Sequence, residues 1–463
     1  MLLALMVCYA VACAPRTEQN QQATDVGALV ITNVHVVPMD SERVLRRHAV
    51  VVRRGVIEGV GPEEDIAMPA DARQVDGRGA YVLPGLADMH VHLRSESELP
   101  SYVAHGVTTV AHLSGTGNGL DPLRARERVA AGELLGPAIL TSGPILDGNP
   151  PIFSSVSTVV TTASAATTTV AGQLAAGFDF IKIYNNLEPD VAQAVISAAH
   201  TSGRAVFGHI PRRGGRDRAL QRALDAGLDV IAHAEEYFFT FFYGDVEARL
   251  DRGEIPHPDT TRIPIAVELT RDAGATVIPN LSFVAMTRQL LDSVDLVLAD
   301  PETRYLSART LESWRNDNPT RRPDAGRFDR REQAKYPFVR RLTKALSDAR
   351  VPLLLGTDAS APGLFPGRSA HLELRELVAA GLTPFEALAT GTRNAGRFVR
   401  SNVAAAQAFG VIARGNRADL ILVRGNPLDD IGNAARIEAV VLQGQWLPAP
   451  KLALMRDERA ARR

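Results

Sequence analysis

The stretch that decides the fold is Tyr81-Val-Leu-Pro-Gly-Leu-Ala-Asp-Met-His-Val-His92, an apolar run that ends in two histidines. Its composition predicts a buried strand with an irregular start at Pro84-Gly85. His90 and His92 occupy positions i and i+2, so their side chains point to the same face of that strand. Two adjacent imidazoles suit a transition metal. Because such a pair is equally typical of two hydrogen-bonded histidines at a strand end, the rest of the sequence has to decide.

The bulk composition fits a large globular protein without a charge-driven partner. The chain has 463 residues, of which 45% are hydrophobic and 22% are charged, and its net charge is −1. This length suits one large domain and a smaller one. A near-neutral chain gives no electrostatic reason to expect nucleic acid or an acidic membrane surface as partner. Beyond the N-terminus no uncharged apolar span of about 18 residues occurs, so no transmembrane segment is predicted.

Residues 1–24 are predicted to be an export signal followed by a linker. Residues 1–13 form a short apolar run, and a polar stretch follows from Thr17 to Asp25. The small residues before Cys13 resemble a bacterial lipoprotein cleavage site. No Lys or Arg precedes the run, however, and Ala10 stands where such sites usually carry Leu. We expect an exported protein, either periplasmic or anchored to the membrane by a lipid on Cys13.

Cysteine usage limits the chemistry of any metal site. Both cysteines, Cys8 and Cys13, lie inside the predicted export segment. The folded body therefore has no disulfide and no thiolate ligand. A metal site in this body must be built from nitrogen and oxygen donors.

Both ends of the chain consist of short β segments with tight turns. Residues 28–75 and 409–447 show alternating apolar segments punctuated by glycine, for example Ala439-Val-Val-Leu-Gln-Gly. Such segments are typical of hairpins in a small sheet. We therefore expect residues 25–80 and 405–463 to form one composite β-sandwich domain.

Between these ends the pattern changes to strands followed by helices. Helical stretches such as 190–202 and 216–226 separate eight apolar strands over roughly 320 residues, which fits a (β/α)8, TIM-like barrel of about 250 residues plus insertions. We assign this α/β barrel to residues 81–404. A doubly wound open sheet is the second interpretation, but no Gly-rich phosphate loop follows the first strand. After the strand that ends at His92, the predicted strands are 107–113, 138–145, 178–184, 205–210, 229–234, 275–281 and 351–357.

Two stretches of the barrel region depart from this repeat. Residues 237–243, Tyr-Phe-Phe-Thr-Phe-Phe-Tyr, contain six aromatic side chains in seven positions. They are interpreted either as a wall of the substrate pocket, or as a buried helix or a contact between a lid and the body of the protein. A long polar segment at about 284–345, between the last two strands, predicts a lid or an added helical layer.

Candidate catalytic and metal-ligating residues lie where the later strands end. In a barrel of this type the active site is formed at those strand ends. Lys182 lies in the fourth strand, His209 and His233 end the fifth and sixth, and Asp358 follows the eighth. Lys182 and His209 are 27 residues apart, and His209 and His233 are 24 apart. Each separation equals one strand-helix unit. Singly, the histidines are also typical of core residues, and the aspartate of a turn or helix cap.

Lys182 is the most unusual of these residues. The chain has only four lysines beside many arginines, and burial of an unpaired ammonium in an apolar strand is costly. One interpretation is a lysine that reaches solvent or an ion pair. The other is a lysine that reacts with carbon dioxide to form a carbamate, a carboxylate-like ligand that bridges two cations. Arginine cannot do this because its guanidinium stays protonated.

The motifs PGLADMHVHL, GVTTV, GFDFIKIY, FGHI, DVIAHAEE, LLLGTDAS and AGLTPFEALATGTRNAGR resemble the amidohydrolase superfamily, as does the tail GVIARGNRADLILVRGNPLDDI. The resemblance is to its imidazolonepropionase-like and prolidase-like subgroup and extends over about residues 28–447. It implies a distorted barrel flanked by a β-sandwich formed from both chain ends. The family's T.NAA motif is replaced by Thr392-Arg-Asn-Ala-Gly396, a structural position away from the site.

By position, the resemblance implies two divalent metal ions, expected to be zinc, with manganese, cobalt and iron left open. His90, His92 and Asp358 would hold the first ion, His209 and His233 the second, and carboxylated Lys182 would bridge both. Two bridged cations would lower the pKa of a shared water toward about 7 and polarise a carbonyl.

The predicted reaction is hydrolysis of a C–N bond by metal-activated water. Asp358 would accept the proton of the water and deliver it to the leaving nitrogen. The absence of a Gly-x-Ser-x-Gly elbow argues against covalent acyl catalysis. The expected substrate is a small or peptide-like amide, such as a dipeptide or an N-acyl amino acid. An esterase or lactonase on the same centre, and a non-catalytic binding protein, are the alternatives.

Four residues are predicted to contact the substrate. Tyr184 follows the bridging lysine, Asn280 follows the seventh strand, and Tyr237 opens the aromatic run after His233. Arg212 lies just past His209 and would bind a substrate carboxylate, although loop arginines are more often solvated. The oligomeric state is left open.

Overall fold

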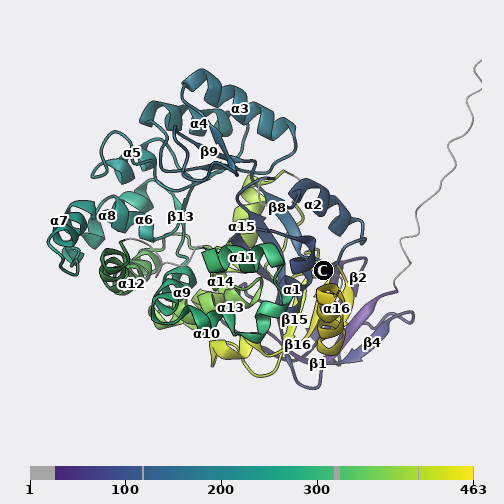
Figure 1. Ribbon diagram of the computed structural model, residues 1–463. Coiled ribbons are helices and arrows are strands. Elements are labelled where there is room, and N and C mark those ends of the chain that lie inside the picture. The colour runs from purple at the N-terminus through teal and green to yellow at the C-terminus, as the bar shows by residue number, and fades with distance from the viewer. Residues whose placement is uncertain (1–26, 117–118, 317–323, 405, 462–463) are drawn as a thin grey trace, which may run out of the picture.

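The structure is a computed structural model that describes residues 27–116, 119–316, 324–404 and 406–461 (Figure 1). The predicted export segment, with Cys8 and Cys13, lies outside the described residues. No helix in the described ranges is long and apolar enough to span a bilayer.

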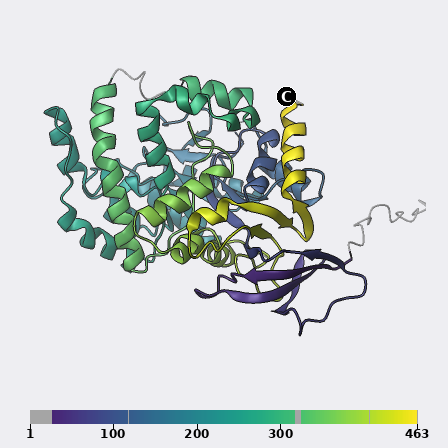
Figure 2. The same ribbon diagram turned by 90° about the horizontal axis from the view of Figure 1, so that it is seen from below.

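The two ends of the chain form one β domain, as the sequence predicts. Its strands belong to a single eight-stranded sheet in the order β17-β16-β15-β5-β1-β2-β3, with β4 beside β1. Figure 2 shows the N-terminal strands as a layer against the helical body. The strands are β1 (Leu29–Val36), β2 (Leu45–Arg53), β3 (Val56–Pro62), β4 (Arg73–Asp76), β5 (Tyr81–Pro84), β15 (Leu420–Val423), β16 (Ile437–Leu442) and β17 (Gln445–Pro448).

The seam between the two ends is the antiparallel pair β5–β15, where Val82 faces Leu422. The sheet curls so that β3 also reaches the C-terminal part, because the Ile57 amide donates to the Asn416 carbonyl at 2.9 Å. Inside the curl, apolar residues of both chain ends share one core, including Ile31 and Val441. Continuous hydrogen bonding therefore replaces the two separate sheets of a simple sandwich.

Parallel strands form the barrel in two arcs. The first arc is β6 (Leu86–Val91), β7 (Val107–His112) and β8 (Ala138–Thr141). The second has the order β10-β9-β11-β12-β13-β14. Its strands are β9 (Ile145–Asp147), β10 (Ser157–Val159), β11 (Ile181–Ile183), β12 (Val206–Gly208), β13 (Val230–Ala232) and β14 (Thr276–Ile278).

Isolated parallel bridges close the two arcs into a barrel. Ser142 pairs with Phe180 between the arcs, Val277 pairs with Leu353, and Val91 pairs with Ala359. The segment 351–359 thus takes the place of the eighth strand although only isolated bridges mark it. Because a closed barrel has no free sheet edge, the doubly wound open sheet is excluded. The fold is a distorted (β/α)8 barrel with a small β domain.

Helices surround this barrel in chain order (Figure 1). At its base Phe398 of α15 packs on Phe180 and Phe207, with ring centroids 6.2 and 5.5 Å away. The helices are α1 (Leu99–Ala104), α2 (Pro122–Ala130), α3 (Ala163–Ala175), α4 (Pro189–Thr201), α5 (Ala219–Asp225), α6 (Glu235–Phe239), α7 (Tyr243–Asp251), α8 (Ile263–Asp272), α13 (Arg368–Ala379), α14 (Pro384–Thr390), α15 (Arg393–Asn402) and α16 (Ala449–Ala461), with short 3-10 turns at Glu96–Glu98, Thr260–Arg262, Pro301–Tyr305 and Ile431–Ala435.

The long polar segment before the eighth strand is a helical layer. It consists of α9 (Leu281–Asp292), α10 (Val294–Leu298), α11 (Ala308–Asn316) and α12 (Ala325–Asp348). Helix α12 packs against α9, α8, α6 and α7. The aromatic run lies beneath it, since the Phe242 and Phe338 rings are 4.7 Å apart. The run comprises the end of α6, a turn and the start of α7, and none of its residues lines the cavity. It is a contact between the helical layer and the body of the protein and not a wall of the pocket.

Candidate metal centre

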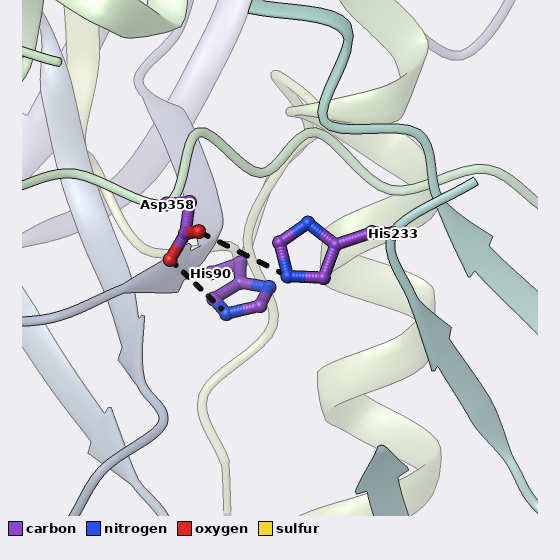
Figure 3. A group of neighbouring side chains, drawn as sticks. All are labelled: His90, His233 and Asp358. Carbon is purple, nitrogen blue, oxygen red and sulfur yellow. Dashed lines mark ion pairs between the residues drawn. The ribbon is translucent and has the colours of Figure 1, made fainter. Parts of the chain in front are cut away.

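Three predicted ligands face one another at the C-terminal ends of the barrel strands. Figure 3 shows His90, at the end of β6, His233, just after β13, and Asp358, on the loop that follows the eighth segment. Asp358 Oδ1 is 3.6 Å from His90 Nε2, and Asp358 Oδ2 is 3.9 Å from His233 Nε2. The candidate ligand atoms of all three residues lie within 4.8 Å of one another. This spacing suits donors around a shared ion.

The remaining predicted ligands adjoin this group. His92 Nε2 is 2.9 Å from Asp358 Oδ1, and the His209 and His233 ring centroids are 4.8 Å apart. Lys182 lines the same cavity from β11. The structure thus brings together all six residues that the sequence singles out, and it places Asp358 beside members of both predicted ligand sets.

Two of these residues have a backbone conformation that side chains disfavour. The φ angles of His233 and Asp358 are 97° and 63°, in the left-handed region. The amide of Asp358 donates to the His90 carbonyl at 2.8 Å, and the amide of His233 donates to the Ile278 carbonyl at 3.3 Å. Such conformations cost about 1–3 kcal/mol each and persist where the surrounding structure imposes them, often at functional sites.

Burial keeps His90, His209 and His233 neutral, whereas a hydrogen bond and nearby charges keep Asp358 ionised. Burial lowers the pKa of His90 well below its usual value, an effect that the Lys182 charge reinforces, and it lowers the pKa of His233 to about 4. Burial also lowers the pKa of His209, against the opposing effect of Glu236. Asp358 is buried too, but its contact with His92 and the nearby positive charges lower its pKa to about 2. Neutral imidazoles and a carboxylate are the donor forms that a divalent cation requires.

Lys182 is a buried amine without a counterpart. Its side chain is only 1% exposed, and Nζ has no hydrogen-bond partner among the described residues. Burial lowers the pKa of Lys182 to about 8, although the Asp358 and Glu236 charges oppose this. The uncharged amine is therefore accessible near neutral pH. An amine in this state fits carbamate formation, and the donor set as a whole fits divalent cations.

Glu236 adjoins the candidate ligands, and the sequence did not single it out. Its Oε1 lies 2.8 Å from His209 Nδ1 and accepts a hydrogen bond from Arg212 at 2.7 Å. Its Oε2 accepts from the Ile210 amide at 3.1 Å. Burial alone would favour the neutral acid, but Arg212 and His209 hold the pKa of Glu236 below its usual range. This carboxylate orients His209 and leaves its Nε2 for a metal. The signal available in the sequence is an acidic residue three positions after His233.

Asp88 and His112 fix the backbone around the histidine pair. Asp88 Oδ2 accepts from the Thr357 hydroxyl at 2.6 Å, and Oδ1 accepts from the Thr357 amide at 3.0 Å. Asp88 thereby ties β6 to the residue before Asp358. His112 Nδ1 accepts from the Leu93 amide at 2.9 Å, directly after His92. Asp88 and His112 thus fix the backbone next to Asp358 and next to His92, two of the three predicted ligands of the first ion.

The four predicted substrate contacts have different surroundings. Tyr184 lines the cavity, and its ring centroid is 4.0 Å from that of His209. Arg212 is engaged by Glu236 behind His209. Tyr237 lies in the hydrophobic core, where its hydroxyl is 2.7 Å from Thr270 Oγ1. Asn280 is fully buried at the start of α9. Of the four, only Tyr184 is among the residues that line the cavity.

The cavity over these ligands has a volume of about 510 Å³. The six predicted ligands are among the residues that line it. Its sides come from the loop after β9, from α9 and from the helical layer, including Phe153, Phe283 and Phe328. A cavity of this size suits a small molecule with a few polar groups at one end.

Comparison with known proteins identifies the family. Residues 81–447 match the model of the Amidohydrolase family, and the chain belongs to this family. It is 30% identical over 188 residues to a dihydroorotase of Trichlorobacter lovleyi, which covers 40% of this chain and 38% of that protein. It is 29% identical over 102 residues to an adenine deaminase of Ruegeria sp. (strain TM1040), covering 21% and 17%. These matches thus span well under half of the relatives' own length.

Solved structures agree with the fold. A bottromycin amidohydrolase superposes with a TM-score of 0.70 and 24% identity, over 94% of this chain and 90% of that one. A superposition over 94% of this chain covers both the barrel and the β domain. At this level of identity it supports the architecture and not the substrate.

Proposed function

We propose that this protein is a binuclear metal-dependent hydrolase of carbon–nitrogen bonds. The observation that carries the proposal is one buried group in which the neutral His90 and His233 lie beside the ionised Asp358, while the Lys182 amine has no hydrogen-bond partner among the described residues. The family membership supports hydrolysis in general, and the donor set supports divalent metal ions.

In this proposal two sets of residues hold the ions. His90, His92 and Asp358 would bind one ion, and His209 and His233 the other, with a carbamate on Lys182 shared between them. When bound, the cations would lower the pKa of a bound water and polarise the substrate carbonyl. Zinc is the expected metal, because nitrogen and oxygen donors in a compact buried group suit it.

The protein's own groups would handle the proton. Asp358 is ionised at neutral pH, so it can accept the proton of the attacking water. Its carboxylate also lies within 4 Å of ring nitrogens of His90, His92 and His233, and the hydrogen bond with His92 favours its charged form. In amide hydrolysis the same carboxyl group would return the proton to the leaving nitrogen.

The test is elemental analysis combined with hydrolysis of N-acyl amino acids, dipeptides and matched aryl esters. We expect about two cations per chain, hydrolysis of amides, and loss of at least about a thousandfold in kcat with Asp358→Asn, a typical range for an acid–base group. Turnover of esters alone would make the protein an esterase or lactonase. Fewer than one cation per chain and no hydrolysis would indicate a binding protein.

A further inference from the structure

An exposed phenylalanine stands at the mouth of the metal cavity. Phe153 lines the cavity and yet is 51% exposed, and its neighbour Ile152 is 49% exposed. Large apolar side chains at the rim of a polar-floored cavity mark a surface that a ligand covers. Packing in the protein core therefore does not explain why Phe153 stands at this position.

The loop that carries Phe153 is held firmly in place. The buried Asp147 carboxylate accepts hydrogen bonds from the Ile152 amide at 2.8 Å and from the Asn186 amide at 2.8 Å. At Gly148 a Cβ atom would lie 1.7 Å from the Asn186 carbonyl oxygen, so the loop packs directly on the segment that follows Tyr184. The exposure of Phe153 is thus a built feature of the rim.

Aromatic rings connect this rim to the metal ligands. The Phe153 and Tyr184 centroids are 5.6 Å apart in an edge-to-face contact, and Tyr184 lies 4.0 Å from the His209 ring. On the other flank, the Phe283 ring lies 5.7 Å from that of His233. Two aromatic walls thus stand over the ligand histidines. Such walls favour a flat or branched apolar group by dispersion and aromatic contacts.

Among the described residues that line the cavity, no carboxylate is free to pair with a substrate ammonium. Among the described lining residues the carboxylates are Asp358 and Glu235. Glu235 Oε2 is 2.5 Å from Nζ of Lys335, a buried lysine of α12 that is also 2.8 Å from Glu332. Glu235 is therefore already neutralised by the helical layer. An ammonium group brought here would lose its hydration without gaining a partner.

We propose that the site selects amides that carry an aromatic or branched apolar group beside the scissile bond and no ammonium there. Phe153 and Tyr184 on one side and Phe283 on the other hold that group. This inference rests on the proposed hydrolysis of C–N bonds and narrows it to N-blocked substrates.

Three compounds that differ by one group test this selection on the metal-loaded enzyme. 3-Phenylpropanoyl-alanine has the phenyl group and no amine, propanoyl-alanine lacks the phenyl, and phenylalanyl-alanine adds the α-ammonium. We expect kcat/KM for the first to exceed that for each of the others about tenfold or more. Propanoyl-alanine lacks a buried phenyl group, which is worth about ten- to a hundredfold in affinity, and the ammonium of phenylalanyl-alanine would lose its hydration without gaining a partner. Equal values, or preference for the free dipeptide, would overturn the proposal.

Substitutions of Phe153 test whether this side chain causes the preference for the phenyl group. Phe153→Ala should lower kcat/KM for 3-phenylpropanoyl-alanine about tenfold and change that for propanoyl-alanine less than twofold. Phe153→Leu should retain most of the preference. Leu454→Ala removes an equally exposed side chain on the remote helix α16 and should change neither value. An equal effect of Phe153→Ala on both substrates would contradict a selective role.

A binding measurement separates this proposal from the hydrolytic function. Calorimetric titration of a Lys182→Met variant with the same three compounds reports affinity without turnover. We expect the same order of affinities as for kcat/KM. If the wild type hydrolyses none of the compounds but this order holds, the reaction assignment fails and the pocket assignment stands. If the order is absent, the pocket assignment fails whatever the reaction.

Discussion

His209 Nδ1 lies 2.8 Å from Glu236 Oε1, and this buried carboxylate, 0% exposed, also accepts from Arg212. One oxygen thus fixes the orientation of a candidate ligand ring and neutralises a guanidinium. The pair explains why an arginine predicted to meet the substrate lies behind the ligand instead.

Glu236→Gln should weaken binding of the second cation. Loss of a carboxylate partner behind a ligating histidine typically costs about ten- to a hundredfold in metal affinity. Competition titration with a chromophoric chelator measures this, with Glu254→Gln, an exposed glutamate, as control. Unchanged affinity in a folded variant would remove Glu236 from the centre.

Lys182→Ala should remove one of two cations and nearly all activity. Without the amine no bridging carbamate can form, and the cavity left behind is large enough for a small carboxylic acid. Addition of formate or acetate should therefore restore part of the activity, whereas chloride should not. Metal content by elemental analysis and kcat together check this. Two cations and full activity in the variant would refute the bridging role.

Glu373 should make stability fall as the pH rises from about 4.5 to 7. Burial raises the pKa of Glu373 to about 7, although it accepts hydrogen bonds from the Leu281 and Ser282 amides at 3.0 and 2.6 Å. The folded state thus keeps a proton that the unfolded state releases, so stability present below pH 4.5 is lost through this window. Glu373→Gln cannot titrate.

The difference in Tm between Glu373→Gln and the wild type should therefore become more positive from pH 5 to pH 8. Thermal denaturation at matched ionic strength measures it, and effects common to both proteins cancel. Glu268→Gln, at an exposed position of α8, should show a constant difference. A constant difference for Glu373→Gln as well would contradict the shifted pKa.

Cys13→Ser should release the protein from membranes if Cys13 carries a lipid, as the N-terminal sequence predicts. Fractionation of cells that express the full chain, with incorporation of labelled palmitate, checks this. We expect label and membrane association for the wild type and neither for the variant. If the wild type and the variant were equally soluble and neither carried label, the prediction of a lipid anchor on Cys13 would be wrong.

The sequence predicted the barrel and the convergence of the six candidate ligands because both follow from chain order. Strand ends recur once per strand-helix unit, so Lys182, His209 and His233 had to meet if the strands were parallel neighbours. Their roles as metal ligands stay predictions. The sequence predicted a regular eighth strand, but in the structure segment 351–359 pairs with its neighbours only through isolated bridges.

The surroundings of the ligands were not predictable in the same way. Tyr237 is close to His233 in sequence and Phe153 is far from every candidate ligand, yet Tyr237 is buried against Thr270 while Phe153 lies at the rim of the cavity. Tyr237 is buried where α12 packs over α6, whereas the loop of Phe153 is fixed by hydrogen bonds of Asp147 to the Ile152 and Asn186 amides. Periodicity carries no information on such contacts. For the same reason Glu236 and Asp88 were missed although they adjoin the ligand motifs.

The seam between β5 and β15 joins two segments that lie far apart in the sequence. Strand β5 leads within two residues into β6, which carries His90, and its partner β15 follows the whole barrel in the chain. Without β15, that side of β5 is an unpaired strand edge. A chain cut short before residue 420 would therefore contain every candidate ligand and still lack the support of the strand that leads to the first of them.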